Sequence, residues 1–172
     1  MQATKTQTHS IDELIHRLAN HDGTVRHDAR VALVSAGLPT VHALMGTLSS
    51  SNADARWEAA KALSELRDPE AAPALVTALL DEQPGVRWLA AEALALIGRP
   101  ALEPLLHGLI EHSGSPWFRD GAHHVLRTFG KGTLDDMLKP LIDALEGRDQ
   151  SIGVLIPAHE LLESLSEARA AL

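Results

Sequence analysis

The chain has 172 residues, a formal net charge of −8 and no cysteine. The lack of cysteine excludes disulfides, thiol catalysis and cysteine-ligated metal sites, and the negative charge disfavours nucleic acid or anionic membranes as general partners, because phosphate binding needs a basic surface. No apolar run approaches the roughly 18 residues of a membrane span, and residues 1–9 lack the apolar core of a secretory signal.

Helices joined by short polar turns are predicted along the whole chain after a flexible tail at residues 1–9. The first helix begins at a capping box formed by Ser10 and Glu13. N-cap residues or a proline in the first turn mark the starts of later helices, and several helices end at glycine. The predicted helices span residues 11–19, 25–36, 38–48, 55–66, 69–80, 86–97, 100–110, 118–129, 133–145 and 154–162, the last with a polar extension at 163–169.

One phrase recurs in every second predicted helix: an apolar residue followed by Arg, with Ala three places after the Arg. The arginines are spaced 30, 31 and 32 residues apart, and a weaker fifth copy at 154–162 has lost its Arg. Two helices repeated in register at this interval are typical of a helical solenoid. We therefore predict an all-α protein, an α-solenoid of about five antiparallel helix pairs forming a single domain over residues 10–172. The arginines are Arg26, Arg56, Arg87 and Arg119.

These phrases resemble the HEAT-repeat family, in particular its short bacterial form, the phycobilisome-lyase-like or E–Z type repeat. The Arg with its apolar neighbour, the following Ala, and the helix-ending Gly37, Gly98 and Gly130 carry the resemblance, which covers roughly residues 10–165. It implies a HEAT-like superhelix whose second helices line the concave face. It also implies that the repeated arginines are structural and pack between repeats as a ladder.

Helical geometry separates a core face from an exposed face in each phrase. At about 100° per residue, the first apolar position, the Ala four places on and the Leu eight places on share one face, which is the predicted core. The position two places on lies opposite, and the positions six and nine places on flank it. The residues predicted to form a binding surface on this exposed face are Trp57, Trp88, Lys61, Glu92, His27, Asp120, His124 and Arg127.

Trp57 and Trp88 stand on consecutive repeats and leave two alternatives open. Stacked helices lie roughly 8–10 Å apart, so the two indoles can form one exposed apolar strip flanked by charges, as in a binding hot spot. Alternatively, each indole folds over its neighbour's helix and fills a groove between repeats. Trp117 precedes the fourth phrase and is predicted to lie in a turn, packed on the edge of the rod.

Ten histidines invite a metal or haem interpretation. The HEAT-like enzyme deoxyhypusine hydroxylase binds two irons through His-Glu pairs repeated at one place in several repeats. Here His27-Asp28 has no matching histidine in the other repeats, and His159-Glu160 falls out of register. The segment at His159 also lacks the second histidine of a zinc-protease motif. We therefore predict no metal site and no cofactor.

The remaining chemical motifs are incomplete. His123 and His124 are adjacent on one helix and point about 100° apart, so they are poorly placed to hold one ion together. His124 is instead expected to meet Glu92 or His27 across repeats. Residues 130–133, Gly-Lys-Gly-Thr, lack the order and the preceding strand of a phosphate-binding loop and are interpreted as a helix–helix turn. No catalytic residue is predicted.

Three functions compete. The favoured one is a non-catalytic interaction module, a cytoplasmic bacterial scaffold that binds a protein or peptide on its concave face and is a monomer. The second is a cofactor- or metal-handling protein, because bilin lyases and the hydroxylase share this type of repeat. The third is a DNA reader resembling the HEAT-like alkylpurine glycosylases, which is faintly echoed by Arg30, Arg127 and Asp120 beside the two tryptophans; the net charge and the short chain argue against it.

Overall fold

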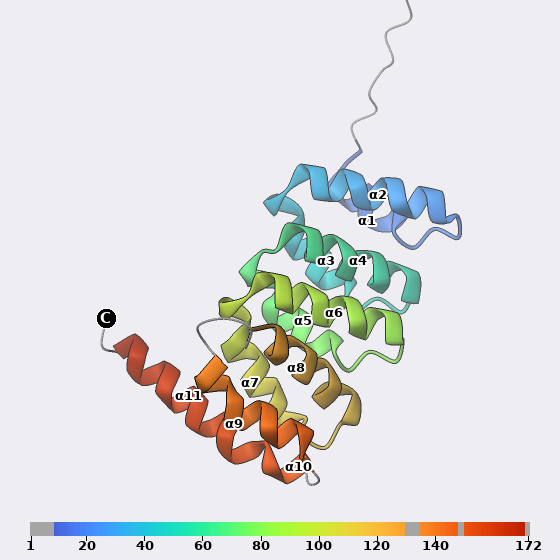
Figure 1. The fold of residues 1–172 in the computed structure, drawn as a ribbon. Coiled ribbons are helices and arrows are strands. Elements are labelled where there is room, and N and C mark those ends of the chain that lie inside the picture. The colour runs from blue at the N-terminus through green and yellow to red at the C-terminus, as the bar shows by residue number, and fades with distance from the viewer. Residues whose placement is uncertain (1–8, 130–134, 148–149, 171–172) are drawn as a thin grey trace, which may run out of the picture.

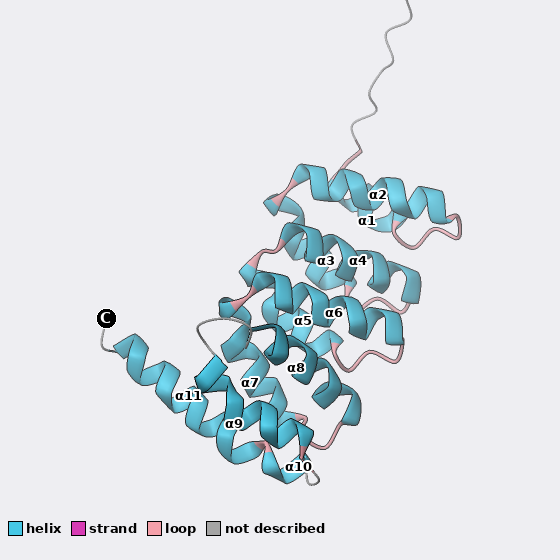
Figure 2. Cartoon of the chain, in the orientation of Figure 1, coloured by secondary structure: helices cyan, strands magenta, loops and turns pink. Residues whose placement is uncertain are grey.

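A computed structural model describes residues 9–129, 135–147 and 150–170. This part of the chain contains helices joined by short loops and turns and no strand (Figure 1, Figure 2). The α-helices are α1 (Ile11–Arg17), α2 (Gly23–Ala36), α3 (Val41–Thr47), α4 (Ala53–Leu66), α5 (Ala72–Ala78), α6 (Pro84–Ile97), α7 (Leu102–Glu111), α8 (Pro116–Phe129), α9 (Asp135–Glu146), α10 (Gln150–Gly153) and α11 (Leu155–Ala170).

Several of the predicted helix starts and stops are found in the structure. Ser10 caps α1, its hydroxyl accepting from the Glu13 amide at 3.2 Å, and the Ser115 hydroxyl accepts from the Phe118 amide at 3.3 Å at the start of α8. Gly37 follows α2 with a φ of 75°, a value that few other residues adopt without strain. The predicted cap at Thr133 and the turn at 130–133 lie outside the described residues, as does the predicted tail apart from its last residue.

Three predicted helices begin with a tighter turn than expected. The helices predicted at 38–48, 69–80 and 100–110 each open with a three-residue 3₁₀ turn that contains a proline. Proline has no amide hydrogen to donate and a fixed φ, which suits the first turn of a helix. These 3₁₀ turns, η1 (Leu38–Thr40), η2 (Pro69–Ala71) and η3 (Arg99–Ala101), lead directly into α3, α5 and α7.

The first four helix pairs form two parallel layers. The second helices, α2, α4, α6 and α8, pack in series, each against the next, while α1 contacts α3 and α5 contacts α7 in the other layer. Figure 1 shows the second helices stacked in front of the first helices. The predicted α-solenoid is confirmed. None of the described helices combines the length and the apolar character needed to cross a membrane.

The last pair exchanges the two layers. Helix α9 packs against α8 of the second layer, whereas α11 packs against α7 of the first layer (Figure 1). The fifth phrase at 154–162 predicted a helix equivalent to α8, and this register is corrected. The phrase lacks the arginine that ties each preceding second helix to its own turn, so that constraint is absent at this end of the solenoid.

The predicted core face is confirmed. Leu33, Leu63, Leu94 and Leu126, which share one position in the phrase, are all completely buried. The alanines four places earlier are buried too, which allows the helices of successive repeats to approach closely. Gly108 of α7 shows how tight this packing is: a Cβ atom there would lie 2.6 Å from Val76 Cγ1 and 2.7 Å from Phe118 Cζ.

Replacing Gly108 by alanine should therefore destabilise the fold, by roughly 1–3 kcal/mol, because overpacking a filled core forces side chains and backbone to shift. The matched control is Gly46→Ala in α3, where a Cβ atom would meet nothing within 4 Å. That change should stabilise by up to about 1 kcal/mol through helix propensity. Urea unfolding of both variants provides the measurement, and equal stabilities would contradict the packing described here.

Candidate functional site

Each repeated arginine is tied to the turn of its own repeat. The guanidinium Nη1 atoms donate to the carbonyl oxygen six residues upstream, at 2.8 Å for Arg26, 2.9 Å for Arg56 and 2.8 Å for Arg87. Arg119 makes the same bond to the carbonyl of Ser113. Backbone carbonyls that no helix satisfies need such a partner. The bonds explain why the arginine recurs, and they confirm the structural role that the resemblance implied.

Three of these arginines also reach the next repeat: Arg26, Arg56 and Arg87. Arg56 makes a two-pronged ion pair with Asp81, from Nε to Oδ2 at 2.6 Å and from Nη2 to Oδ1 at 3.0 Å. This hydrogen bonding raises the pKa of Arg56. Arg26 lies 3.4 Å from the carboxylate of Asp54. Arg87 differs, because its guanidinium lies over the ring of Trp117, 4.5 Å from the ring centroid. We call this set of contacts the arginine ladder.

His27 lies at the N-terminal end of the solenoid, in a separate polar cluster. Its Nδ1 accepts from Arg30 Nη2 at 2.9 Å. Arg30 is buried and also donates to Glu58 Oε2 at 3.0 Å and to Glu65. His27 is therefore not gathered with the two predicted tryptophans, and its nearest charged partner belongs to its own helix.

The two tryptophans of the phrase behave differently. Trp57 is 40% exposed, yet its ring packs over the first turn of α6: a Cβ atom on Gly85 would lie 3.2 Å from Cδ1 and 3.3 Å from Nε1 of the indole. Trp88 is 58% exposed. No ring contact joins Trp57 to Trp88 among the described residues, so Trp57 follows the groove-filling alternative while Trp88 remains open to solvent.

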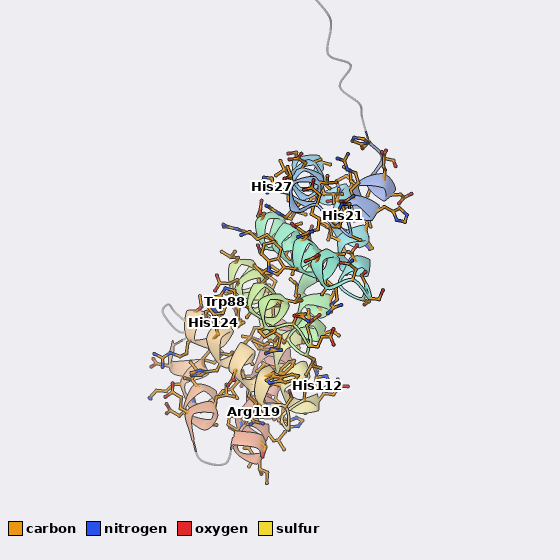
Figure 3. All side chains as sticks on the ribbon, turned by 90° about the vertical axis from the view of Figure 1, so that its right-hand side faces the viewer. His21, His27, Trp88, His112, Arg119 and His124 are labelled. Carbon is orange, nitrogen blue, oxygen red and sulfur yellow. The ribbon has the colours of Figure 1, made fainter. Side chains whose placement is uncertain are left out.

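Trp88 lines a pocket of about 240 Å³ between α6 and α8. Trp117 also lines this pocket and belongs to the first turn of α8 rather than to a loop; the predicted position in a turn is corrected. Trp117 is itself 52% exposed. Figure 3 shows Trp88 and His124 beside each other on one flank of the molecule. The pocket is lined by Pro84, Arg87, Trp88, Ala91, Trp117, Asp120, Gly121 and His124.

A single change between repeats explains the pocket. The position just before the phrase holds Gly85 in the third repeat and Trp117 in the fourth. The indole of Trp57 lies down over Gly85, which has no side chain in the way. The equivalent place beside Trp88 is filled by a second indole. Trp88 of α6 and Trp117 of α8 both line the pocket that lies between these two helices.

The pocket also carries charge. Asp120 is exposed and makes no hydrogen bond or ion pair with any residue that the structure describes. The ring of His124 lies 4.9 Å from that of Trp88, tilted by 48°, and its Nε2 is 2.8 Å from Glu92 Oε1. The predicted contact of His124 with Glu92 is confirmed. Trp88, Glu92, Asp120 and His124 are thus four predicted residues that the structure brings together.

The other predicted residues lie outside the pocket. Arg127 donates to Glu146 of α9 at 2.7 Å, and His123 lies 3.0 Å from the same carboxylate. These two hydrogen bonds lower the pKa of Glu146. Lys61 is half-buried on α4, on the repeat before the pocket. Because the layer exchange places α9 against α8, Arg127 is directed towards the C-terminal end of the solenoid.

Comparison with known proteins identifies a repeat family. The chain matches the family described as HEAT repeats over residues 11–87 and 78–153. The chain belongs to the HEAT-repeat family. Two crystal structures of engineered proteins from the Northeast Structural Genomics Consortium are similar to this HEAT chain, at 20% and 22% identity, each with a TM-score of 0.49. The matches cover 88% and 89% of this chain and 77% and 79% of those proteins. No curated protein matches it significantly.

The HEAT repeats bring few potential metal ligands together. In residues 9–129, 135–147 and 150–170, no group of three or more His, Asp or Glu side chains is arranged to hold a metal ion. His159 and Glu160 are exposed on α11, and His27 is bound to Arg30. The aromatic and charged side chains of the α6–α8 pocket form the candidate site.

Sequence reasoning missed Trp117 and the stacking of Arg87 on it. Both have a signal in the sequence once the repeats are aligned, because the position before the phrase changes from Thr24 and Asp54 to Gly85 and then to Trp117. A bulky aromatic residue there stands next to the exposed Trp88 of the preceding HEAT repeat. The alignment thus reveals the second wall of the pocket, although not its shape.

The arginine ladder predicts unequal costs for two arginine substitutions. Arg56→Met should destabilise the protein by roughly 3 kcal/mol or more, because it leaves the buried Asp81 without its ion-pair partner and a turn carbonyl without a donor. Arg127→Met removes an exposed ion pair with Glu146 and should cost no more than about 1 kcal/mol. Thermal unfolding compares the two variants, and similar losses would contradict the ladder's structural role.

Proposed function

We propose that this HEAT solenoid is a non-catalytic interaction module that binds a protein or peptide on the exposed face of its second helices, the face expected to be concave. The observation that carries the proposal is the pair of exposed tryptophans, Trp88 and Trp117, that line one pocket together. Solenoids offer extended surfaces of this kind for partners. The pocket between α6 and α8 is the proposed anchor point.

The composition of the pocket supports this function. Tryptophan and arginine are the residue types most enriched at the energetic centres of protein interfaces, and Trp88, Trp117 and Arg87 stand together here. Pockets for drug-sized ligands and cofactors enclose roughly 300–1,000 Å³, whereas this one encloses about 240 Å³. Its size suits one inserted side chain better than a whole cofactor.

The surface around the pocket supports a longer contact. Trp57 on α4 is partly exposed, and Lys61 is half-buried on the same helix. Glu92 and His124 bridge α6 to α8 beside the pocket. An extended segment that lies across α4, α6 and α8 would meet an aromatic side chain on each of the three helices, with polar side chains between them.

The competing functions receive less support. A metal- or cofactor-handling protein would rest on the number of histidines, whose described members form no three-ligand group. A DNA reader would need Arg30 and Arg127 as phosphate ligands, but these cations are paired with Glu58 and Glu146. A kinship with the bacterial E–Z type repeat, a cytoplasmic location and a monomeric state remain predictions from the sequence.

Selection from an unbiased phage-displayed peptide library against the full chain tests the proposal. Wild-type protein should enrich a family of peptides, and synthetic copies should bind the Trp88→Ala variant at least about tenfold more weakly, because hot-spot aromatics contribute roughly 2 kcal/mol or more. Calorimetric titration measures the affinities, and the melting temperature should stay close to that of the wild type because Trp88 is largely exposed.

Leu38→Ala is the matched control, since Leu38 is an equally exposed large residue on the 3₁₀ turn η1, outside the proposed surface. It should leave peptide affinity unchanged. If no peptide is enriched, or if enriched peptides bind wild type and Trp88→Ala with equal affinity, the proposed site is refuted. A strong fall in melting temperature for Trp88→Ala would show instead that this indole stabilises the fold.

A further inference from the structure

We propose that the pocket between Trp88 and Trp117 receives a cationic side chain, lysine or arginine, from the partner. The inference rests on the proposed function and gives the chemistry of its anchor. It follows from three properties of the pocket: the aromatic walls, a carboxylate without a partner, and the way in which the positive charges already present are held.

The aromatic walls suit a cation. The face of an indole attracts ammonium and guanidinium groups within about 6 Å of its centre, and tryptophan does so better than tyrosine or phenylalanine. The molecule contains an example at this place, because the guanidinium of Arg87 lies 4.5 Å from the centroid of the Trp117 ring. Trp88, which lines the same pocket and is more than half exposed, offers a second indole.

Asp120 provides the charge that selects a cation. This residue lines the pocket, is exposed, and has no hydrogen-bond or ion-pair partner in the described part of the chain. It occupies the same position in the fourth repeat as Trp57 and Trp88 in the second and third. A cation between the indoles and Asp120 would combine stacking with a charge-assisted hydrogen bond, which is stronger than a neutral one.

The positive groups beside the pocket are already engaged. Arg87 donates to the carbonyls of Asp81 and Glu82 at 2.8 and 3.2 Å while it covers Trp117. The ring nitrogen of His124 faces Glu92 at 2.8 Å. An anionic ligand would therefore have to compete with carbonyl and carboxylate partners and would also meet Asp120. The chain's net charge of −8 favours approach of a basic partner for the same reason.

Indole N–H signals in proton–nitrogen NMR spectra test the inference directly, because the three tryptophans give three reporters. The probes are the acetylated amides of arginine, lysine, norleucine and glutamate, added to the ¹⁵N-labelled full chain. The arginine and lysine probes should shift the signals of Trp88 and Trp117 and leave that of Trp57 in place. Norleucine has a similar apolar stem without charge and should bind at least about threefold more weakly; glutamate should not bind.

Asp120→Asn is the decisive variant, and Asp28→Asn is its control. Both remove one exposed carboxylate, but Asp28 lies on α2, away from the pocket. Asp120→Asn should weaken binding of the arginine probe about fivefold or more, whereas Asp28→Asn should leave it unchanged. Equal shifts from norleucine and arginine, unchanged binding by Asp120→Asn, or the absence of any shift would each overturn the cationic assignment.

These outcomes are separable from failure of the interaction module itself. If the library selects peptides that depend on Trp88 but carry no lysine or arginine at the critical position, the module stands and the cationic anchor is wrong. Stronger shifts with a single-stranded oligonucleotide than with the basic amides would also overturn the inference, because they would indicate that nucleobases stack on the indoles.

Discussion

The arginine ladder is the interaction on which this solenoid depends. Arg56 shows its double role, because one guanidinium ties a second helix to its own turn and also binds Asp81 of the next repeat. The alanine and leucine side chains of the phrase are buried, but their apolar contacts are non-directional. The ladder thereby links each second helix to the repeat that follows it. At the C-terminal end, where the phrase has lost its arginine, the two layers exchange places.

The candidate site is a local departure from this repetition. Arg56 of the second repeat pairs with the carboxylate of Asp81, whereas Arg87 of the third repeat stacks on the Trp117 ring. The same tryptophan stands where the preceding repeat has Gly85. It therefore stacks on Arg87 of the ladder and also lines the pocket together with Trp88. One residue thus takes part both in the packing of successive repeats and in the candidate site.

Much of the fold could be predicted from periodicity, because residues with the same structural role recur at the same position in several repeats. The buried Leu63 and Leu94, the arginines and the exposure of Trp88 all follow from one helical phrase. What periodicity could not supply are contacts that differ between copies. The way Trp57 lies down depends on the missing side chain of Gly85, so Trp57 follows the groove-filling alternative, whereas Trp88 is exposed and makes no ring contact with Trp57 among the described residues.

Longer-range features were hidden for a different reason. The pairing of Arg127 with Glu146 depends on α9 packing against α8, which no local pattern encodes. Helical angles place Arg127 on the exposed face but do not show which neighbouring carboxylate forms an ion pair with it. Asp120 was placed on the binding surface by the same angles, and its lack of a partner among the described residues became visible only when the neighbouring side chains were placed.

A crystal structure of the Trp117→Gly variant tests most directly whether Trp117 creates the pocket. If the pocket exists because Trp117 replaces the glycine of the preceding repeat, the indole of Trp88 should fold over the first turn of α8, as that of Trp57 does over Gly85. Its exposed fraction should then fall from 58% towards the 40% of Trp57. A Trp88 side chain that keeps its position and exposure in the variant would contradict the claim that this exchange between repeats creates the site.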